Sequence, residues 1–241
     1  MSAARAASAP SPAPIWVPDA VLDDLRARLA RVRWPAAPTP GWEHGADVET
    51  IRELVRAWRD DFDWRRQEGL LDERLPGHRA RVRGLELHFA WLKGRGPRPL
   101  PLLLLHGWPG STFEMIKVAG SLADPAAHGS DPADAFDLVI PSLPGHGFSE
   151  APSDPLFGAD DAADVLRDLM VGVLGYARFG AQGGDRGAFI AAGLAAWIVE
   201  KWCAWSDCEG DVLGRFTREE LLTNVMLYWV SGCIRSFRER S

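Results

Sequence analysis

Two segments near the start of the chain carry apolar side chains at helical spacing. The first opens at Pro18 and ends before Pro35, and its apolar positions are Val21, Leu22, Leu25, Leu29 and Val32. The second begins near Asp47, and its apolar face consists of Ile51, Leu54, Val55 and Trp58. Intervals of three and four residues predict amphipathic helices, and the residue before a proline is a usual helix end. The sequence therefore predicts a helical N-terminal arm.

Later segments have the pattern of β-strands. Residues 85–91 alternate apolar and polar side chains, which predicts a half-buried edge or hairpin strand. Residues 100–105 are a continuous apolar run and residues 136–140 are apolar apart from Asp137, which is typical of strands that are covered on both faces. A segment long enough for one helix separates these two runs, and a helix over 159–174 leads to a short strand near 179–182. This alternation predicts an α/β fold with a mainly parallel sheet.

Composition limits the classes of partner. The net charge is −6 over 241 residues, and the basic residues are interspersed with acids, which argues against nucleic acid or an anionic membrane surface as the partner. Cys203, Cys208 and Cys233 have neither metal nor redox spacing, so they predict free thiols in a reducing compartment. The first fourteen residues lack the apolar stretch of a signal peptide or membrane helix. We expect a cytoplasmic protein without a transmembrane segment, a metal or a cofactor.

Three loops directly follow predicted strands, where parallel sheets place their ligand sites. They are His106–Ser111, Leu143–Ser149 and Gly183–Gly187. In the first loop the glycines allow a tight turn, and Trp108 offers a backbone N–H. The second loop contains His146, for which a direct chemical role is one hypothesis and a place in a plain turn the other. A chain reversal alone also explains the first loop, so the coincidence of all three carries more weight than any one.

The third loop reads Gly-x-Asp-x-Gly between a strand and a helix, which is the pattern of a nucleophile elbow. Small residues flank the nucleophile because the tight turn brings two backbones close together. The central residue here is Asp185 rather than a serine. A carboxylate attacks carbon and forms an alkyl ester, so its targets are strained ethers or carbon–halogen bonds.

With these loops in view, the chain resembles the microsomal-type epoxide hydrolases. The matching stretches are RLARVRWP, FDWRRQE, HGWPGS, PSLPGHGFS and YARFGAQGGD, and both GLAAWIVEKW and ELLTNVMLYW are similar to later helices of that family's cap. The resemblance implies an α/β-hydrolase fold, here incomplete, preceded by a helical N-terminal domain. It divides the chain into a disordered tail (1–14), an epoxide hydrolase N-terminal domain (15–97), a hydrolase core (98–192) and a cap remnant (193–241).

The resemblance also implies roles for individual residues. Asp185 matches the nucleophile, and the backbone N–H groups of Trp108 and Arg186 match the oxyanion hole. The supporting loop contains His106, Gly107 and Pro109. The implied substrate is a small apolar epoxide, opened to a vicinal diol without metal or cofactor, as in the detoxification or catabolism of aromatic compounds. In the family, cap tyrosines protonate the epoxide oxygen, and a histidine held by a carboxylate activates the water that hydrolyses the ester.

The chain departs from the family pattern in the residues that complete the reaction. All six histidines precede Asp185, so no base, acid partner or cap tyrosine can be assigned, and Tyr228 is expected to pack inside a helix. His106 or His146 as a substitute base is a further hypothesis. Arg186 stands where the family usually has Trp, which removes an apolar wall and places a cation beside Asp185. Core strands expected after the elbow are missing, which predicts an exposed sheet edge and self-association.

Three functional hypotheses follow. The first is an epoxide hydrolase whose activity is impaired by the missing base. The second is a non-catalytic derivative that binds apolar ligands or a full-length relative. The third is a haloalkane dehalogenase-type enzyme that uses the same aspartate, although the N-terminal helical domain argues against it. A covalent adduct, diol formation and halide release distinguish the three.

Overall fold

The computed structural model describes residues 8–35 and 47–191 of the chain. Contacts along the backbone divide these residues into two compact units. We call residues 15–72 the helical unit and the remaining described residues the α/β unit. The boundary at residue 72 lies before residue 97, where the N-terminal domain is predicted to end, because residues 77–92 form strands of the main sheet.

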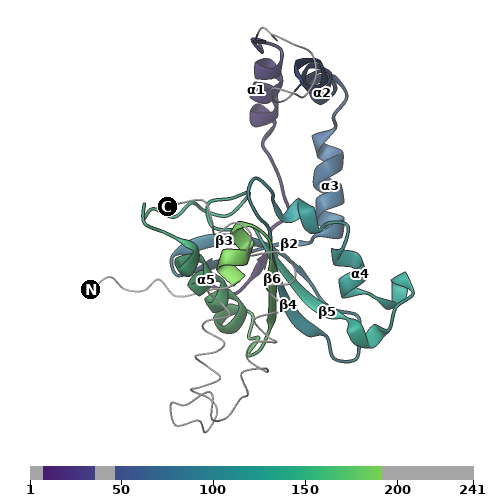
Figure 1. The fold of residues 1–241 in the computed structure, drawn as a ribbon, viewed down its shortest axis with the longest axis vertical. Helices are drawn as coiled ribbons and strands as arrows, with labels where there is room; N and C mark the ends of the chain where they lie inside the picture. The colour runs from purple at the N-terminus through teal and green to yellow at the C-terminus, as the bar shows by residue number, and fades with distance from the viewer. Residues whose placement is uncertain (1–7, 36–46, 192–241) are drawn as a thin grey trace. The chain divides into compact units, whose positions relative to one another are not determined.

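Helices form most of the helical unit (Figure 1). They are α1 Asp19–Leu29, α2 Val48–Asp60 and α3 Trp64–Arg74, whose last two residues fall beyond the unit's boundary. The two predicted helices are confirmed, although Val32 lies past the end of α1. Asp47 caps α2 as its side chain accepts a hydrogen bond from the backbone N–H of Thr50 at 2.9 Å.

A buried carboxylate ties the start of the helical unit to α3. Glu68 accepts hydrogen bonds from the backbone N–H of Val17 and from Nε1 of Trp64, both at 2.7 Å, and it pairs with Arg65 at 2.5 Å. Burial acts to raise the pKa of Glu68, but these hydrogen bonds outweigh burial and lower that pKa. In contrast, α2 has no buried residue at all.

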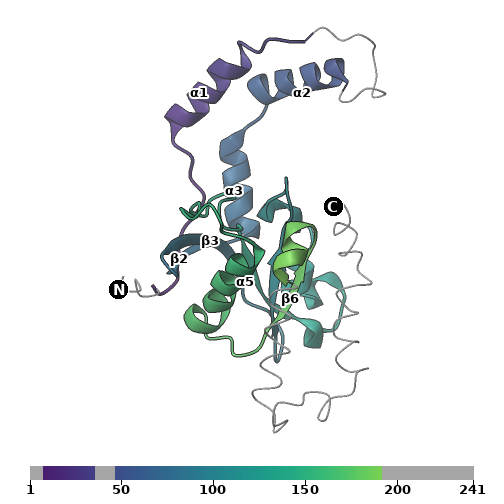
Figure 2. The ribbon, with the colours of Figure 1, turned by 60° about the vertical axis from the view of Figure 1, so that its left-hand side comes forward.

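A six-stranded sheet in the order β1-β2-β3-β5-β4-β6 forms the centre of the α/β unit (Figures 1 and 2). Its strands are β1 Ser11–Pro12, β2 Gly77–Val82, β3 Leu85–Leu92, β4 Leu100–Leu105, β5 Phe136–Pro141 and β6 Gly180–Gly183. β4 pairs in parallel with β5 and β6, whereas the pairs β1–β2, β2–β3 and β3–β5 are antiparallel. The predicted α/β fold is confirmed, with a sheet that is mixed and not mainly parallel.

The antiparallel half of the sheet differs from the sequence predictions. The pattern of residues 85–91 predicts a hairpin strand or an edge strand; β3 is in the hairpin with β2, but it lies inside the sheet, and residues 87–90 are buried. β2 itself is not predicted, because arginines interrupt its apolar positions. Ser11–Pro12 pairs with β2 inside the segment predicted to be a disordered tail. A proline is tolerated there because an edge strand needs only some of its N–H groups for pairing.

The connections between strands are also more broken than predicted. One helix is expected between β4 and β5, but the structure has short pieces: the 3₁₀ helices η1 Thr112–Met115, η2 Ala126–His128 and η3 Pro132–Asp134, and α4 Ala119–Ala123. Pro125 and Gly129, which has a φ of +80°, interrupt the helix on the two sides of η2. The helix predicted over 159–174 is α5 Ala159–Asp168, continued by a π-helical turn, η4 Leu169–Val173.

α5 covers one face of the sheet (Figure 2). Its inner side chains pack on β3 and β4, in a cluster that includes Ala162, Val165, Leu166, Leu87, Phe89, Leu103 and Leu105. At roughly 25 cal/mol for each Å² of apolar surface removed from water, burial of these side chains is the main stabilising contribution in this unit.

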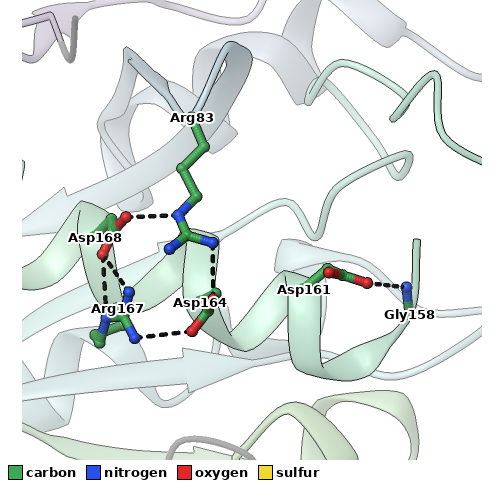
Figure 3. A network of polar contacts seen from close by, with 6 residues as sticks. All are labelled: Arg83, Gly158, Asp161, Asp164, Arg167 and Asp168. Atoms are coloured by element: carbon green, nitrogen blue, oxygen red, sulfur yellow. Dashed lines mark hydrogen bonds and ion pairs between the residues drawn. The ribbon is translucent and has the colours of Figure 1, made fainter. Parts of the chain in front are cut away.

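Ion pairs join α5 to the turn between β2 and β3 (Figure 3). The Arg83 guanidinium lies 2.8 Å from Asp164 and 2.7 Å from Asp168, and Arg167 binds the same two aspartates. Arg83 lies in the tight hairpin turn and has a left-handed backbone conformation, with a φ of +47°. The helix and the hairpin are therefore linked by a shared charge network in addition to apolar packing.

Candidate active site

The carboxyl ends of β4, β5 and β6 lie at one edge of the sheet because these strands run in parallel. Leu105, the last residue of β4, is paired with Gly183, the last residue of β6. The loop that begins at His106 and the turn that contains Asp185 therefore start side by side. The second predicted loop, 143–149, follows β5 on the other side of β4.

The chain turns sharply at Asp185, between β6 and a helix that begins at Arg186. Asp185 has a φ of +50°, a left-handed conformation that residues other than glycine rarely adopt. Gly183 and Gly187 make this turn feasible: a Cβ on Gly183 would lie 2.5 Å from the carbonyl carbon of Gly187, and one on Gly187 would lie 2.7 Å from the backbone oxygen of Leu105. This is the strained geometry in which an elbow presents a nucleophile.

Two backbone amides hold the Asp185 carboxylate. The N–H of Trp108 donates to Oδ1 at 2.9 Å, and the N–H of Arg186 donates a second hydrogen bond. Gly107 permits this approach, since a Cβ there would lie 2.7 Å from the Cβ of Asp185. The two hydrogen bonds, the one from Trp108 foremost, lower the pKa of Asp185 despite the opposing effect of burial. The carboxylate is therefore ionised at neutral pH.

His106 is almost completely buried, and its hydrogen bonds to the backbone indicate a structural role. Its Nε2 accepts a hydrogen bond from the backbone N–H of Leu143 at 3.1 Å, so its Nδ1 carries the proton and donates to the Gly107 carbonyl at 2.9 Å. Burial lowers the pKa of His106. The side chain thus fastens the loop that carries Trp108 to the loop after β5, and both ring nitrogens are occupied.

His146 lies beside His106, with 5.7 Å between the ring centroids, and its Nδ1 is 3.1 Å from the Pro144 carbonyl. It lines a cavity of about 280 Å³ together with Arg186. The remaining lining is mostly apolar and comes from the loop after β5, the start of α5 and the helix after Asp185. Pro109 follows Trp108 in the loop after β4.

Glu114 is a residue near the site that the sequence motifs did not identify. The carboxylate of Glu114 occupies the space beside Gly110, where a Cβ would clash with it, and its charge acts to raise the pKa of His106. The sequence contains a pattern that could have identified this residue, because Ser111 and Glu114 have the spacing of a capping box at the start of η1. Tyr228 and the predicted cap remnant lie outside the described residues.

Within 8–35 and 47–191, no three His, Cys, Asp or Glu side chains are grouped so that they could hold a metal ion. In the same residues, no helix has the length and apolar character that crossing a bilayer requires.

Two family patterns match overlapping parts of the chain. Residues 10–115 match the family described as epoxide hydrolase N terminus, and residues 101–200 match the alpha/beta hydrolase fold. The structure of Aspergillus niger epoxide hydrolase superposes with a TM-score of 0.66 at 32% identity, over 78% of this chain and 49% of that one. The juvenile hormone epoxide hydrolase of Bombyx mori, at 23% identity and a TM-score of 0.67 over 91% of this chain and 57% of that one, has the same fold. The chain thus spans about half the length of these solved structures.

Curated relatives agree with this assignment. A protein of Stigmatella aurantiaca named "Putative epoxide hydrolase" is 31% identical, over 94% of this chain and 67% of the relative. Epoxide hydrolase 1 of Oryctolagus cuniculus is 27% identical, over 90% of this chain and 69% of the relative. The alignment with the Stigmatella protein extends over 298 positions, more than the 241 residues here, so that relative has internal residues without a counterpart in this chain. The chain belongs to the epoxide hydrolase family whose members combine this N-terminal domain with an α/β-hydrolase fold, as its resemblance to the microsomal-type enzymes predicts.

Proposed function

We propose that this chain attacks epoxides with the carboxylate of Asp185 and that the product of the complete reaction is a vicinal diol. The observation that supports this most directly is the elbow: Asp185 at a φ of +50°, with Oδ1 2.9 Å from the N–H of Trp108. An ionised carboxylate at the end of a strand, held by backbone amides, is suited to attack an electrophilic carbon.

The reaction has two steps. In the first, an oxygen of Asp185 bonds to a ring carbon, the carbon–oxygen bond of the epoxide breaks, and the released oxygen takes up a proton from water, which gives a glycol ester. In the second, water adds to the ester carbonyl, and the oxyanion is stabilised by the N–H groups of Trp108 and Arg186. Collapse of this intermediate releases the diol and restores the carboxylate.

We propose that the second step is slow in this chain. The described histidines all precede Asp185; His106 is bound at both nitrogens, and His88 is buried in β3. His146, which lines the cavity beside Arg186, is the remaining candidate for a base near the described site. Without efficient activation of water, the glycol ester is expected to accumulate.

The proposed substrates are small apolar epoxides, aryl epoxides among them. The indole of Trp108 is 67% exposed in the loop that holds Asp185, so it can pack against an apolar ring. A role in detoxification or aromatic catabolism, a cytoplasmic location and self-association stay predictions from the sequence. In the described part of the chain, β6 is a terminal strand of the sheet, which is the edge that such association would use.

A second candidate is a non-catalytic derivative that binds apolar ligands or a longer relative. The observation in its favour is that the Stigmatella protein has internal residues with no counterpart here. A dehalogenase that uses the same aspartate is a third candidate, which differs from the first in releasing halide.

The deciding experiment is intact-mass spectrometry of the full chain after incubation with styrene oxide, with the diol measured in the same sample. We expect one adduct that maps to Asp185, with little diol. Asp185→Ala should abolish the adduct, whereas the matched exposed change Asp134→Asn should not. Steady production of diol contradicts the slow second step, and halide release from 1-bromobutane supports the dehalogenase. If the folded chain gives neither adduct nor product, the non-catalytic candidate stands.

A further inference from the structure

The cavity lined by His146 and Arg186 has one cationic residue in its wall, and that residue is the chain neighbour of the proposed nucleophile. Its volume is about 280 Å³, close to the lower end of the usual range for small-molecule pockets. Phe157, Leu143 and Ile190 contribute apolar surface, and Arg186, the residue that follows Asp185, contributes the cation. The cavity therefore combines an apolar body with a positive charge next to the reacting group.

Arg186 differs from most arginines of the described chain in having no counterion. It is exposed, and no carboxylate of the described residues lies within 4.0 Å of its guanidinium. Its charge acts on Asp185 and lowers the pKa of that group, but the two side chains form no ion pair. Arg83, in contrast, is bound by two aspartates. Because the Arg186 guanidinium has no ion-pair partner among the described residues, it is available to bind a ligand.

The other charged and titratable groups around the cavity also leave Arg186 available for a ligand. Asp161, at the start of α5, is turned back to accept a hydrogen bond from the N–H of Gly158 at 2.8 Å, so it caps its own helix. His146, which also lines the cavity, carries no negative charge in either protonation state. Asp185 is the repelling charge, and the N–H of Trp108 partly compensates it by donating a hydrogen bond to Oδ1 at 2.9 Å.

We propose that Arg186 selects substrates that carry a carboxylate, so that the site prefers epoxides of carboxylic acids with a short apolar body. The planar guanidinium binds a carboxylate through two parallel hydrogen bonds, a geometry that a neutral group cannot reproduce. The apolar body of the acid fills the cavity, and its epoxide faces Asp185. This inference rests on the proposed function for the reaction, but the binding step can be measured without any reaction.

The test uses two unreactive probes of nearly equal size, 3-phenylpropanoate and its neutral amide, titrated calorimetrically into the full chain. We expect the carboxylate to bind roughly tenfold more tightly than the amide, in line with one charge-assisted contact at a partly exposed site. Arg186→Gln should remove this preference, and Arg186→Lys should retain part of it. Arg178→Gln, which changes another exposed arginine without an ion pair in the described residues, should leave it unaltered.

Asp185→Asn separates this inference from the proposed reaction. It removes the repelling charge, so it should tighten carboxylate binding while it abolishes the styrene oxide adduct. An adduct with styrene oxide together with equal binding of both probes would overturn only the inference about Arg186. Carboxylate preference without any adduct would overturn only the proposed reaction. Failure of the folded chain to bind either probe, or a preference that survives in Arg186→Gln, also overturns the inference.

Discussion

The two units of this chain differ in how completely they bury their apolar residues. In the α/β unit, Leu87, Phe89 and Leu103 are fully buried between the sheet and α5. In the helical unit, Leu54 on α2 is 62% exposed, and Trp58 and Phe62 are about half exposed. These residues border an apolar groove of about 730 Å³ whose lining belongs entirely to the helical unit. Apolar residues that a pattern identifies are therefore core in the α/β unit, whereas those on α2 border an open groove.

Buried ionisable groups extend this comparison. The helical unit contains Glu68, whose carboxylate is hydrogen-bonded to Val17, Trp64 and Arg65. The α/β unit contains His88, which is 2% exposed, with Ser142 Oγ at 3.2 Å from Nδ1 and no partner for Nε2 among the described residues. Glu68 is stabilised in its charged form, whereas His88 is stabilised in its neutral form. The two units should consequently respond to acid over different ranges of pH.

The largest expected difference lies in the response to truncation of a leucine. Leu103→Ala leaves a cavity in the core and should reduce the free energy of unfolding by about 2–5 kcal/mol. The matched change Leu54→Ala removes a side chain that is already in water and should cost less than about 0.5 kcal/mol. Urea unfolding of both variants measures this, and equal costs would refute the contrast between the units.

Acid should weaken the α/β unit first. Burial lowers the pKa of His88 to about 4 from an ordinary value near 6.5. Between these values the unfolded chain takes up a proton that the folded chain does not. The contribution of His88 to the free energy of unfolding is therefore fully present above pH 6.5, and it decreases by about 3 kcal/mol as the pH falls to 4. The lowered pKa of Glu68 contributes stability that is lost only at lower pH.

The measurement is the urea midpoint of the chain between pH 7 and pH 4. His88→Gln, which fits a neutral amide in place of the ring, should be less stable at pH 7 but should flatten the curve over this range. An unchanged slope in the variant would assign the acid sensitivity to other groups.

The smallest expected effect concerns surface charge. Arg83→Ala removes two ion pairs that are about half exposed and should cost about 0.5–1 kcal/mol at low salt. Arg28→Ala, which removes a single exposed pair with Asp24 in the helical unit, should cost no more than about 0.5 kcal/mol. In 1 M NaCl, where charges are screened beyond roughly 3 Å, both costs should shrink. A cost for Arg83→Ala that does not depend on salt would mean that its packing, and not its charge, is responsible.

The sequence predicted the two central parallel strands more reliably than the others. β4 is apolar throughout and β5 is apolar apart from Asp137, with residues 103–105 and 138–141 buried, and such runs are visible without a structure. β2 could not be predicted, because its buried positions Ala80 and Val82 alternate with arginines whose stems remain partly exposed. β1 is determined by its pairing with β2, which is a tertiary contact that no local pattern records.

For the site, the motifs predicted that Trp108 and Asp185 come together, since both follow parallel strands. The partners of His106 were beyond prediction, because the hydrogen bond to Leu143 depends on how the loop after β5 bends. Whether His106 is a base or a fastening for the loop is therefore a question that only the fold could address. The exposure of the apolar face of α2 was equally hidden, because periodicity identifies the face but not what covers it.

The hydrogen bond between Trp108 and Asp185 has a practical consequence for spectroscopy. It joins residues that are 77 positions apart, and it can form only after β4 and β6 have paired and the elbow has closed. The exchange of this one amide proton with deuterated solvent should therefore be slow only in molecules whose sheet is assembled as far as β6. A ¹⁵N-labelled chain would report, through the lifetime of a single tryptophan amide signal, the fraction of molecules that contain a formed site.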